Sequence, residues 1–227
     1  MRVIFKQEMQ QLGDDLTRMS RQVATAIERA TAALETADLT LAEQVIDADR
    51  RIDELERQLD EQGISLLARQ GPVATDLRIV VSGLRLSATL ERMGDLARHV
   101  AYVARGRYPE NPTPGPMREI LIKMARQATL VSQQVTQLLE TRDLALAASI
   151  EADDDVLDQL HRESFQVILD DDVPMTRQQL VDAVLLGRYL ERFGDHGVSV
   201  ARRISYLVTG DLTNEVVNPA EQEAHHD

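Results

Sequence analysis

The chain has no cysteine, no tryptophan and few aromatic residues, which make up 3% of its 227 positions. Without cysteine it cannot hold a disulfide framework, a thiolate zinc site, an iron–sulfur cluster or a nucleophilic thiol. Long apolar runs are also missing: none approaches the roughly 20 residues that span a bilayer. The N-terminal residues lack the apolar stretch of a signal peptide. Together these absences predict a cytoplasmic protein without direct membrane insertion.

Positive charge is scarce: the chain has 25 Lys and Arg residues against 38 Asp and Glu residues, so its formal net charge is -13. Nonspecific binding of nucleic acid depends on a surplus of Lys and Arg that releases counterions. Attraction to anionic lipid surfaces needs the same sign of charge. The composition therefore predicts no nucleic-acid partner.

Strong helix formers dominate the composition, and the apolar residues recur at spacings of three and four. No segment shows a sustained period of two, so no strand is predicted. The clearest helical stripe comprises Leu16, Met19, Val23, Ile27, Ala30 and Leu34. The pattern predicts an all-α protein.

Helix breaks divide the chain regularly. Asp38 is a suitable N-cap, because its carboxylate can accept hydrogen bonds from the first turn of a following helix. Gly71–Pro72 and the Asp-rich stretch 170–174 are further breaks, and the Pro-rich stretch 109–116 reads as a linker. Six long helices are therefore expected in two tandem three-helix bundles, at 1–108 and 116–212, followed by a polar tail at 213–227.

The two halves repeat one another. An offset of 105 residues aligns about 15 of 40 positions identically, against roughly 3 expected by chance. Arg21 falls on Arg126 and Glu35 falls on Glu140 in this alignment. Further along, the offset becomes 100 and places the Glu-Arg-x-Gly-Asp motif at 91–95 on a second copy at 191–195. Such a duplication predicts two copies of one helical unit related by pseudo-twofold symmetry.

Each repeat carries two pairs of acids four residues apart, which places the members of a pair on one helical face. One pair lies in the second helix of its repeat and the other in the third, so the antiparallel helices can bring four carboxylates together. A cluster of oxygen ligands suits hard cations such as Mg, Mn, Ca or Fe. The candidate metal ligands are Asp49, Asp53, Glu91 and Asp95 in the first repeat, and Asp154, Asp158, Glu191 and Asp195 in the second.

Two plainer interpretations stay open. Helical carboxylates are commonly solvated or paired with arginine, and nearby candidates for pairing are Arg50, Arg57, Arg92, Arg98, Arg162, Arg188 and Arg192. Gly94 and Gly194, one residue before the last Asp of each motif, point to close helix packing or to exposed backbone at a site. A mid-helix glycine costs about 1 kcal/mol relative to alanine, so a compensating reason is expected.

Catalytic signatures are sparse. His99 and His161 lie near the acidic motifs and are possible nitrogen ligands. Diiron bundle enzymes use two Glu-x-x-His motifs, and the predicted helices contain only the related Asp158-x-x-His161. A carboxylate-bridged metalloenzyme on a helical bundle is thus the alternative to a non-enzymatic adaptor. A coiled-coil scaffold without metal ranks last, because heptads are not sustained.

The doubled Glu-Arg-x-Gly-Asp motif, with the Asp-x-x-x-Asp runs at 49–53 and 154–158, resembles the PhoU family, accessory and regulatory proteins of bacterial phosphate-specific transport. The stretch from Gln70 to Arg78 is similar to the family's Q-P-V-A-x-D-L-R segment, with an additional Gly71. The resemblance covers nearly all of 1–212. A departure is that His99 and Ser199 stand where the family usually has asparagine, so the metal ligands are expected to differ.

The resemblance implies two tandem three-helix bundles, a homodimer, and multinuclear metal sites at the eight acids named above. The expected cofactors are divalent metal ions: Fe, Zn, Mn or Mg. It also implies a non-enzymatic negative regulator of phosphate uptake and of the phosphate-starvation (Pho regulon) response. The expected partners are the ABC ATPase of the phosphate importer and the phosphate-sensing histidine kinase.

Overall fold

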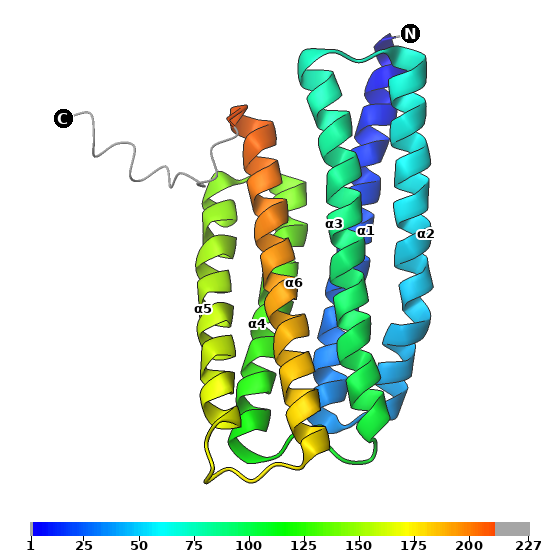
Figure 1. The fold of residues 1–227 in the computed structure, drawn as a ribbon. Coiled ribbons are helices and arrows are strands. Elements are labelled where there is room, and N and C mark those ends of the chain that lie inside the picture. Colours follow the sequence, from blue (N-terminus) through cyan, green and yellow to red (C-terminus); the bar gives the residue numbers. More distant parts are fainter. Residues whose placement is uncertain (1, 212–227) are drawn as a thin grey trace, which may run out of the picture.

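The computed structural model describes residues 2–211, which form six helices and no strand (Figure 1). The predicted all-α class with six long helices is confirmed. The tail predicted at 213–227 lies outside the described residues. The helices are α1 Arg2–Thr36, α2 Leu39–Gln70, α3 Ala74–Arg107, α4 Gly115–Thr141, α5 Leu144–Ile168 and α6 Arg177–Thr209.

The helix ends follow local chemistry. The Asp38 carboxylate accepts a hydrogen bond from the Leu41 N–H at 3.0 Å, which confirms the predicted cap of α2. Its repeat equivalent, Asp143, caps α5 by accepting a hydrogen bond from the Ala145 N–H at 2.9 Å. Gly71 ends α2 in the left-handed conformation, with φ of 51°, which glycine adopts without a steric penalty. The two repeats therefore share their helix-initiation signals as well as their motifs.

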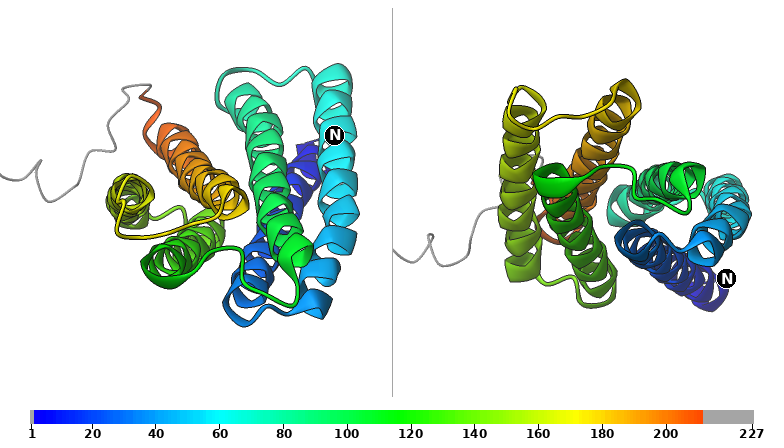
Figure 2. Two further views of the ribbon diagram at one scale, coloured as in Figure 1. Left: turned by 60° about the horizontal axis from the view of Figure 1, so that its bottom comes forward. Right: turned by 90° about the horizontal axis from the view of Figure 1, so that it is seen from below.

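Helices α1–α3 form one bundle and α4–α6 form another, and the bundles lie side by side (Figure 2). Between them, α1 packs against α4 and α3 packs against α6. A single hydrophobic core of buried Leu, Ile, Val, Ala and Met side chains extends through both bundles. The second and third helices of each repeat also pack against one another, which is what the candidate site requires.

Two ion pairs at the junction reveal the pseudo-twofold symmetry. Arg21 of α1 pairs with Glu140 of α4 at 2.6 Å, and Arg126 of α4 pairs with Glu35 of α1 at 2.6 Å. Exchanging the two repeats converts one pair into the other, because Arg21 aligns with Arg126 and Glu35 aligns with Glu140. Reciprocal contacts of this kind are the signature of a twofold interface. The tandem arrangement expected from the duplication is confirmed.

A partly buried ion pair connects the end of α3 to the start of α6. The Arg107 guanidinium donates to both carboxylate oxygens of Asp182, which is only 2% exposed. We expect Arg107→Met to lower the free energy of unfolding by about 2–3 kcal/mol, because Asp182 would remain buried without its cation. Urea titration measures the change. Exposed Arg105 in the same turn is the matched control, and Arg105→Met should cost under about 1 kcal/mol; equal losses would contradict the prediction.

No helix within residues 2–211 is both long enough and apolar enough to cross a membrane.

Candidate functional site

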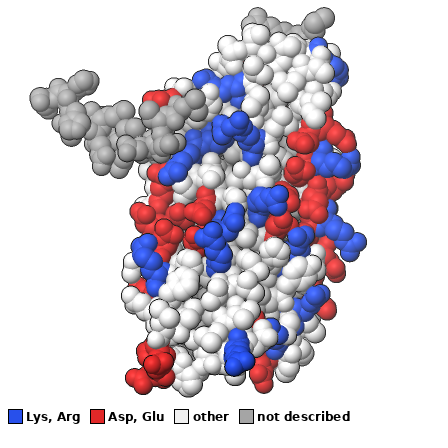
Figure 3. Space-filling view, in the orientation of Figure 1, with Lys and Arg blue, Asp and Glu red and all other residues white. Residues whose placement is uncertain are grey.

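The eight predicted acids gather in two places, one in each bundle. Asp49 and Asp53 lie on α2 opposite Glu91 and Asp95 of α3. In the second bundle the corresponding pairs lie on α5 and α6. Figure 3 shows two separate red patches on one face of the molecule, one over α2 and α3 and the other over α5 and α6. We call these the first cluster and the second cluster.

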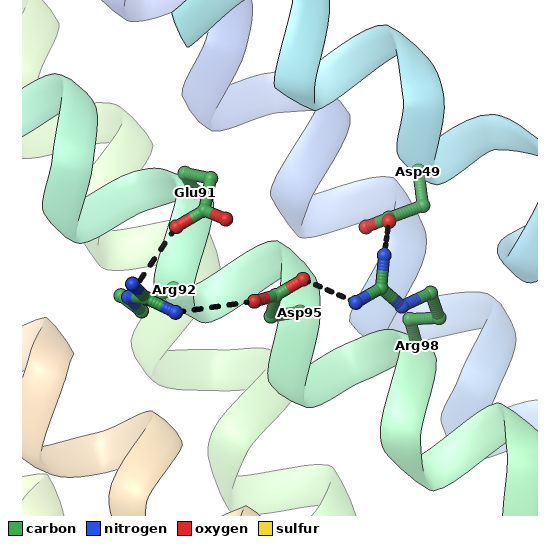
Figure 4. Close-up of polar contacts among 5 residues, drawn as sticks. All are labelled: Asp49, Glu91, Arg92, Asp95 and Arg98. Carbon is green, nitrogen blue, oxygen red and sulfur yellow. Dashed lines mark hydrogen bonds and ion pairs between the residues drawn. The ribbon is translucent and has the colours of Figure 1, made fainter.

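An arginine occupies the first cluster. The Arg98 guanidinium donates one hydrogen bond to Asp49 of α2 and another to Asp95 of α3, the latter at 2.5 Å (Figure 4). Arg92 approaches Asp95 and Glu91 more loosely, at 3.5 Å each. Arg98 is 24% exposed and Asp49 only 4%. The guanidinium therefore sits between the two helices, where its charge partly offsets those of Asp49 and Asp95.

The pKa of Asp49 reflects this burial. Desolvation raises the pKa of the Asp49 carboxyl, and the charge of Arg98 opposes that rise. Burial by itself would lower the pKa of Arg98, but Asp49 and Asp95 reverse the effect and raise it. Removing the guanidinium would thus leave a buried carboxylate without a counter-charge, which is costly.

The second cluster lacks this arginine. The repeat alignment places Val198 where the first repeat has Arg98, and Val198 is only 7% exposed. The Oδ1 atom of Asp154 is buried and has no hydrogen-bond partner within the described residues. Burial raises the pKa of Asp154 to about 7, and the negative charges of Asp158 and Asp195 contribute to the rise. The second cluster therefore holds uncompensated negative charge.

Glu191 is the best-neutralised member of the second cluster. Arg188, one turn earlier on α6, donates to both of its carboxylate oxygens at 2.6 and 2.7 Å. Burial still raises the pKa of Glu191, and Asp195 raises it further. Arg188 lies on the same helix as Glu191 and makes no bridge to α5, so it does not replace Arg98.

The two motif glycines allow the helices to approach closely at the clusters. A Cβ on Gly194 would overlap the Oδ1 atom of Asp154 and lie 2.6 Å from Cδ2 of Leu157. A Cβ on Gly94 would lie 2.9 Å from Cδ1 of Ile52. Both glycines are buried within helices. Close helix packing is thus confirmed as one reason for them, and the backbone of α6 directly faces Asp154.

We expect Gly194→Ala to lower the free energy of unfolding by about 1–2 kcal/mol. The methyl group would collide with Asp154 and Leu157, and that overpacking outweighs the gain in helix propensity. Gly13→Ala is the control, because a Cβ added there, in the first half of α1, would meet no atom within 4 Å apart from its chain neighbours and the local helix backbone. That control should raise stability by about 0.5–1 kcal/mol. Thermal and urea unfolding measure both, and shifts of the same sign would contradict this account.

The histidines lie beside the clusters rather than in them. His99 packs against Tyr189 of α6, with ring centroids 5.0 Å apart, and its buried Nδ1 atom has no hydrogen-bond partner among residues 2–211. Burial lowers the pKa of His99, and the charge of Arg98 adds to the effect. His161 packs against Phe165 at 5.0 Å. Metal ligation by either histidine stays a prediction.

The side chains of the two clusters are not equally suited to binding a divalent cation. Within residues 2–211, no three His, Asp or Glu side chains are already arranged as a metal site. The second cluster has the right donor set, since it combines oxygen ligands with an unpaired buried carboxylate atom. In the first cluster the charge of Arg98 already compensates Asp49 and Asp95. The oxygen donors of the second cluster therefore suit a divalent cation, whereas those of the first cluster are already paired with Arg98.

One signal for this difference was present in the sequence. The same alignment that matches the acidic motifs also sets Arg98 against Val198. Arg98 is one of seven arginines near the motifs, and only the structure distinguishes it. Arg50 pairs with Asp47, Arg57 pairs with Glu54 and Glu61, and neither pairs with a member of the first cluster.

The family model described as the PhoU domain matches residues 16–104 and again residues 121–204. The chain belongs to the PhoU family. The two matches fall within the two helical repeats and include all eight acids, so this PhoU chain contains the family's domain twice.

Curated relatives agree with the match. The phosphate-specific transport system accessory protein PhoU homolog 2 of Mycobacterium tuberculosis is 40% identical over 210 residues, which cover 92% of this PhoU chain and 99% of the relative. The PhoU homolog 1 of Mycobacterium leprae is 38% identical over 219 residues, with 96% and 99% covered.

Solved PhoU structures share the fold. The crystal structure of PhoU from Pseudomonas aeruginosa aligns with a TM-score of 0.79 and 29% identity, covering 91% of this chain and 100% of that one. PhoU from Streptococcus pneumoniae aligns with a TM-score of 0.82 over 92% of this chain and 99% of that one, and at 24% identity it shows the fold alone.

Proposed function

We propose that this PhoU protein is a cytoplasmic, non-enzymatic negative regulator of phosphate uptake and of phosphate-starvation signalling. It would couple the ABC ATPase of the phosphate importer to the sensor histidine kinase. Family membership over both repeats supports a role as an accessory protein of phosphate transport. The M. tuberculosis relative carries that description in its name.

The second cluster carries the mechanistic part of the proposal. Its single most telling observation is the buried, unpartnered Oδ1 atom of Asp154, next to a glycine and surrounded by like charge. A divalent cation such as Mn, Mg, Fe or Zn would offset most of the negative charge of Asp154, Asp158 and Asp195. These side chains would have to turn toward one another, since they do not form a preassembled site.

Cation binding would act through the two helices that supply the ligands. Asp154 and Asp158 belong to α5, whereas Asp195 belongs to α6. Without a cation their mutual repulsion opposes the packing of α5 on α6; with one, the two helices would be held together. In the first bundle Arg98 does this permanently. We propose that the rigidity of the second bundle therefore depends on whether the cation is bound, and that a partner protein recognises this difference.

A homodimer fits the apolar surface of the second bundle. Several large apolar side chains of α5 and α6 are exposed within the described residues: Val156, Phe165, Val181, Val184 and Leu185. Covering such a surface with a second copy would remove it from water. Light scattering of the purified chain tests this.

A carboxylate-bridged metalloenzyme would need an open coordination position and a general base. No feature of the described residues favours that alternative over the adaptor.

The proposed function is tested by affinity capture from cells grown in high and in low phosphate, with bound proteins identified by mass spectrometry. The expected partners are the importer ATPase and the sensor kinase, captured by the wild type. Asp154→Asn with Asp158→Asn should reduce capture, whereas the same change at the exposed neighbour Asp155 should not. Recovery of neither partner from either culture would refute the proposal.

The metal is tested separately by elemental analysis of the purified protein and by thermal unfolding with added Mn, Mg, Zn or Fe. The wild type should bind metal and unfold at a higher temperature, and the double variant should do neither.

A further inference from the structure

A groove lies between the N-terminal half of α3 and the C-terminal half of α6, and the clusters contribute no residue to it. Its volume is about 590 Å³. Figure 3 shows blue side chains gathered on this face over the upper part of α6 and toward α3. The groove is lined by Ala74, Thr75, Leu77, Arg78, Val81, Ser82, Arg85, Arg203 and Tyr206.

Among residues 2–211, three arginines line this groove and no carboxylate does, in a chain whose net charge is -13. Within the part of the chain that the structure describes, the guanidinium groups of Arg78, Arg85 and Arg203 make no hydrogen bond and no ion pair. The Nε atom of Arg78 is moreover buried. Burial lowers the pKa of Arg203, and the charge of Arg85 lowers it further. The groove therefore holds concentrated, uncompensated positive charge.

Tyr206 positions two of the three cations. The guanidinium carbon of Arg78 lies 5.4 Å from the centroid of the Tyr206 ring, and that of Arg203 lies 5.9 Å from it. Cation–π contacts of this kind restrict the side chains before any ligand arrives. Two arginines from different bundles are thus directed at one place, which reduces the ordering cost of binding.

The start of α3 adds further donors. Val73, the N-cap residue, makes no side-chain hydrogen bond to the first turn, so the first N–H groups of α3 have no side-chain cap. The Asp76 N–H already donates to the Val73 carbonyl at 3.2 Å. The helix dipole and the remaining N–H groups of the first turn favour an anion. Thr75 of this turn lines the groove, whereas Asp76, the acidic residue of the same turn, is exposed and does not line it.

We propose that the groove between α3 and α6 binds an anion that carries phosphoryl groups, held by Arg78, Arg85 and Arg203. A phosphoryl group offers three oxygens and up to two negative charges, so it can satisfy several guanidiniums at once. A single carboxylate has one charge and two oxygens, which is too little for three arginines. Arginine is also the side chain whose planar fork best matches phosphate oxygens.

The groove walls suggest what else the ligand contains. Leu77 and Val81 line the groove, and Leu77 is 40% exposed. The groove is larger than inorganic phosphate needs, and an apolar wall offers a surface for an organic group. A nucleoside diphosphate and free phosphate both carry the phosphoryl oxygens that the arginines would bind, and their affinities can be compared.

The test is isothermal titration calorimetry of the full chain in a chelator, which removes any contribution of cations at the clusters. Inorganic phosphate, pyrophosphate and adenosine diphosphate are the probes. Binding with a dissociation constant below about 1 mM is expected for at least one of them. A preference for adenosine diphosphate over pyrophosphate would identify a nucleotide, whereas equal affinities would identify the phosphoryl groups alone.

Matched variants locate the site. Arg78→Gln and Arg203→Gln should each weaken binding about tenfold or more, because each removes a charge-assisted hydrogen-bond donor. Arg29→Gln, an exposed arginine of α1, should leave binding unchanged. Arg203→Gln should also not lower the melting temperature, since it relieves repulsion from Arg85. The proposal is overturned if none of the three probes binds at about 10 mM, or if both groove variants bind as tightly as the wild type.

Discussion

In metal-free buffer, Arg98→Met should lower the free energy of unfolding by about 2–3 kcal/mol. The substitution keeps most of the side-chain volume but removes the cation between α2 and α3. Asp49, which is 4% exposed, would then be buried beside Asp95 without a counter-charge. Urea titration in the presence of a chelator measures the loss.

The same variant should gain a response to divalent cations. With Arg98 gone, the first cluster resembles the second, so added Mn or Mg should stabilise Arg98→Met more than it stabilises the wild type. Arg92→Met is the matched control, because Arg92 is 65% exposed and its contacts with Glu91 and Asp95 are loose, at 3.5 Å each. If Arg92→Met proves as costly as Arg98→Met, or if cations leave the Arg98 variant unchanged, Arg98 is not the internal cation of the first cluster.

Asp154→Asn should stabilise the metal-free protein at pH 8 by about 1–2 kcal/mol, a value reduced for the partial exposure of Asp154. The pKa of Asp154 is about 7 in the folded protein and ordinarily 3.8. Between pH 3.8 and pH 7 the Asp154 carboxyl is therefore protonated in the folded state but ionised in the unfolded state. The wild type is therefore most favoured near pH 4 and loses this contribution as pH rises toward 7. The amide carries no charge, so this loss should disappear in the variant.

Added divalent cation should make the wild type more stable than Asp154→Asn, the reverse of their order in metal-free buffer. At pH 8 the wild type binds the cation through the ionised Asp154 and gains stability, whereas Asp154→Asn loses a ligand and gains little. Thermal unfolding from pH 5 to 8, with chelator and with Mn, supplies both comparisons. Asp155→Asn, at an exposed neighbouring position, should follow the wild type throughout. A wild-type profile that rises from pH 5 to 8 in chelator would contradict the burial of Asp154.

Much of the fold could be predicted because its causes are local. Apolar spacing identifies the helices, and Asp38 and Gly71 identify their ends by chemistry that acts within one turn. The duplication predicts the symmetry, and the reciprocal Arg21–Glu140 and Arg126–Glu35 pairs follow from it once α1 meets α4. The candidate acids could be predicted too, because two pairs recur in both repeats.

The sequence by itself thus determined the six helices, the duplication, the family and the positions of the acidic motifs. Only the tertiary structure decided which acids are paired with a cation, because that depends on Arg98 of α3 reaching across to Asp49 of α2, whereas the aligned Val198 has no charge to offer Asp154. It also decided that Arg78 and Arg203, 125 positions apart in the chain, share one tyrosine. Charge pairing between helices falls off steeply with distance in water, so it is settled by packing and not by spacing along the chain.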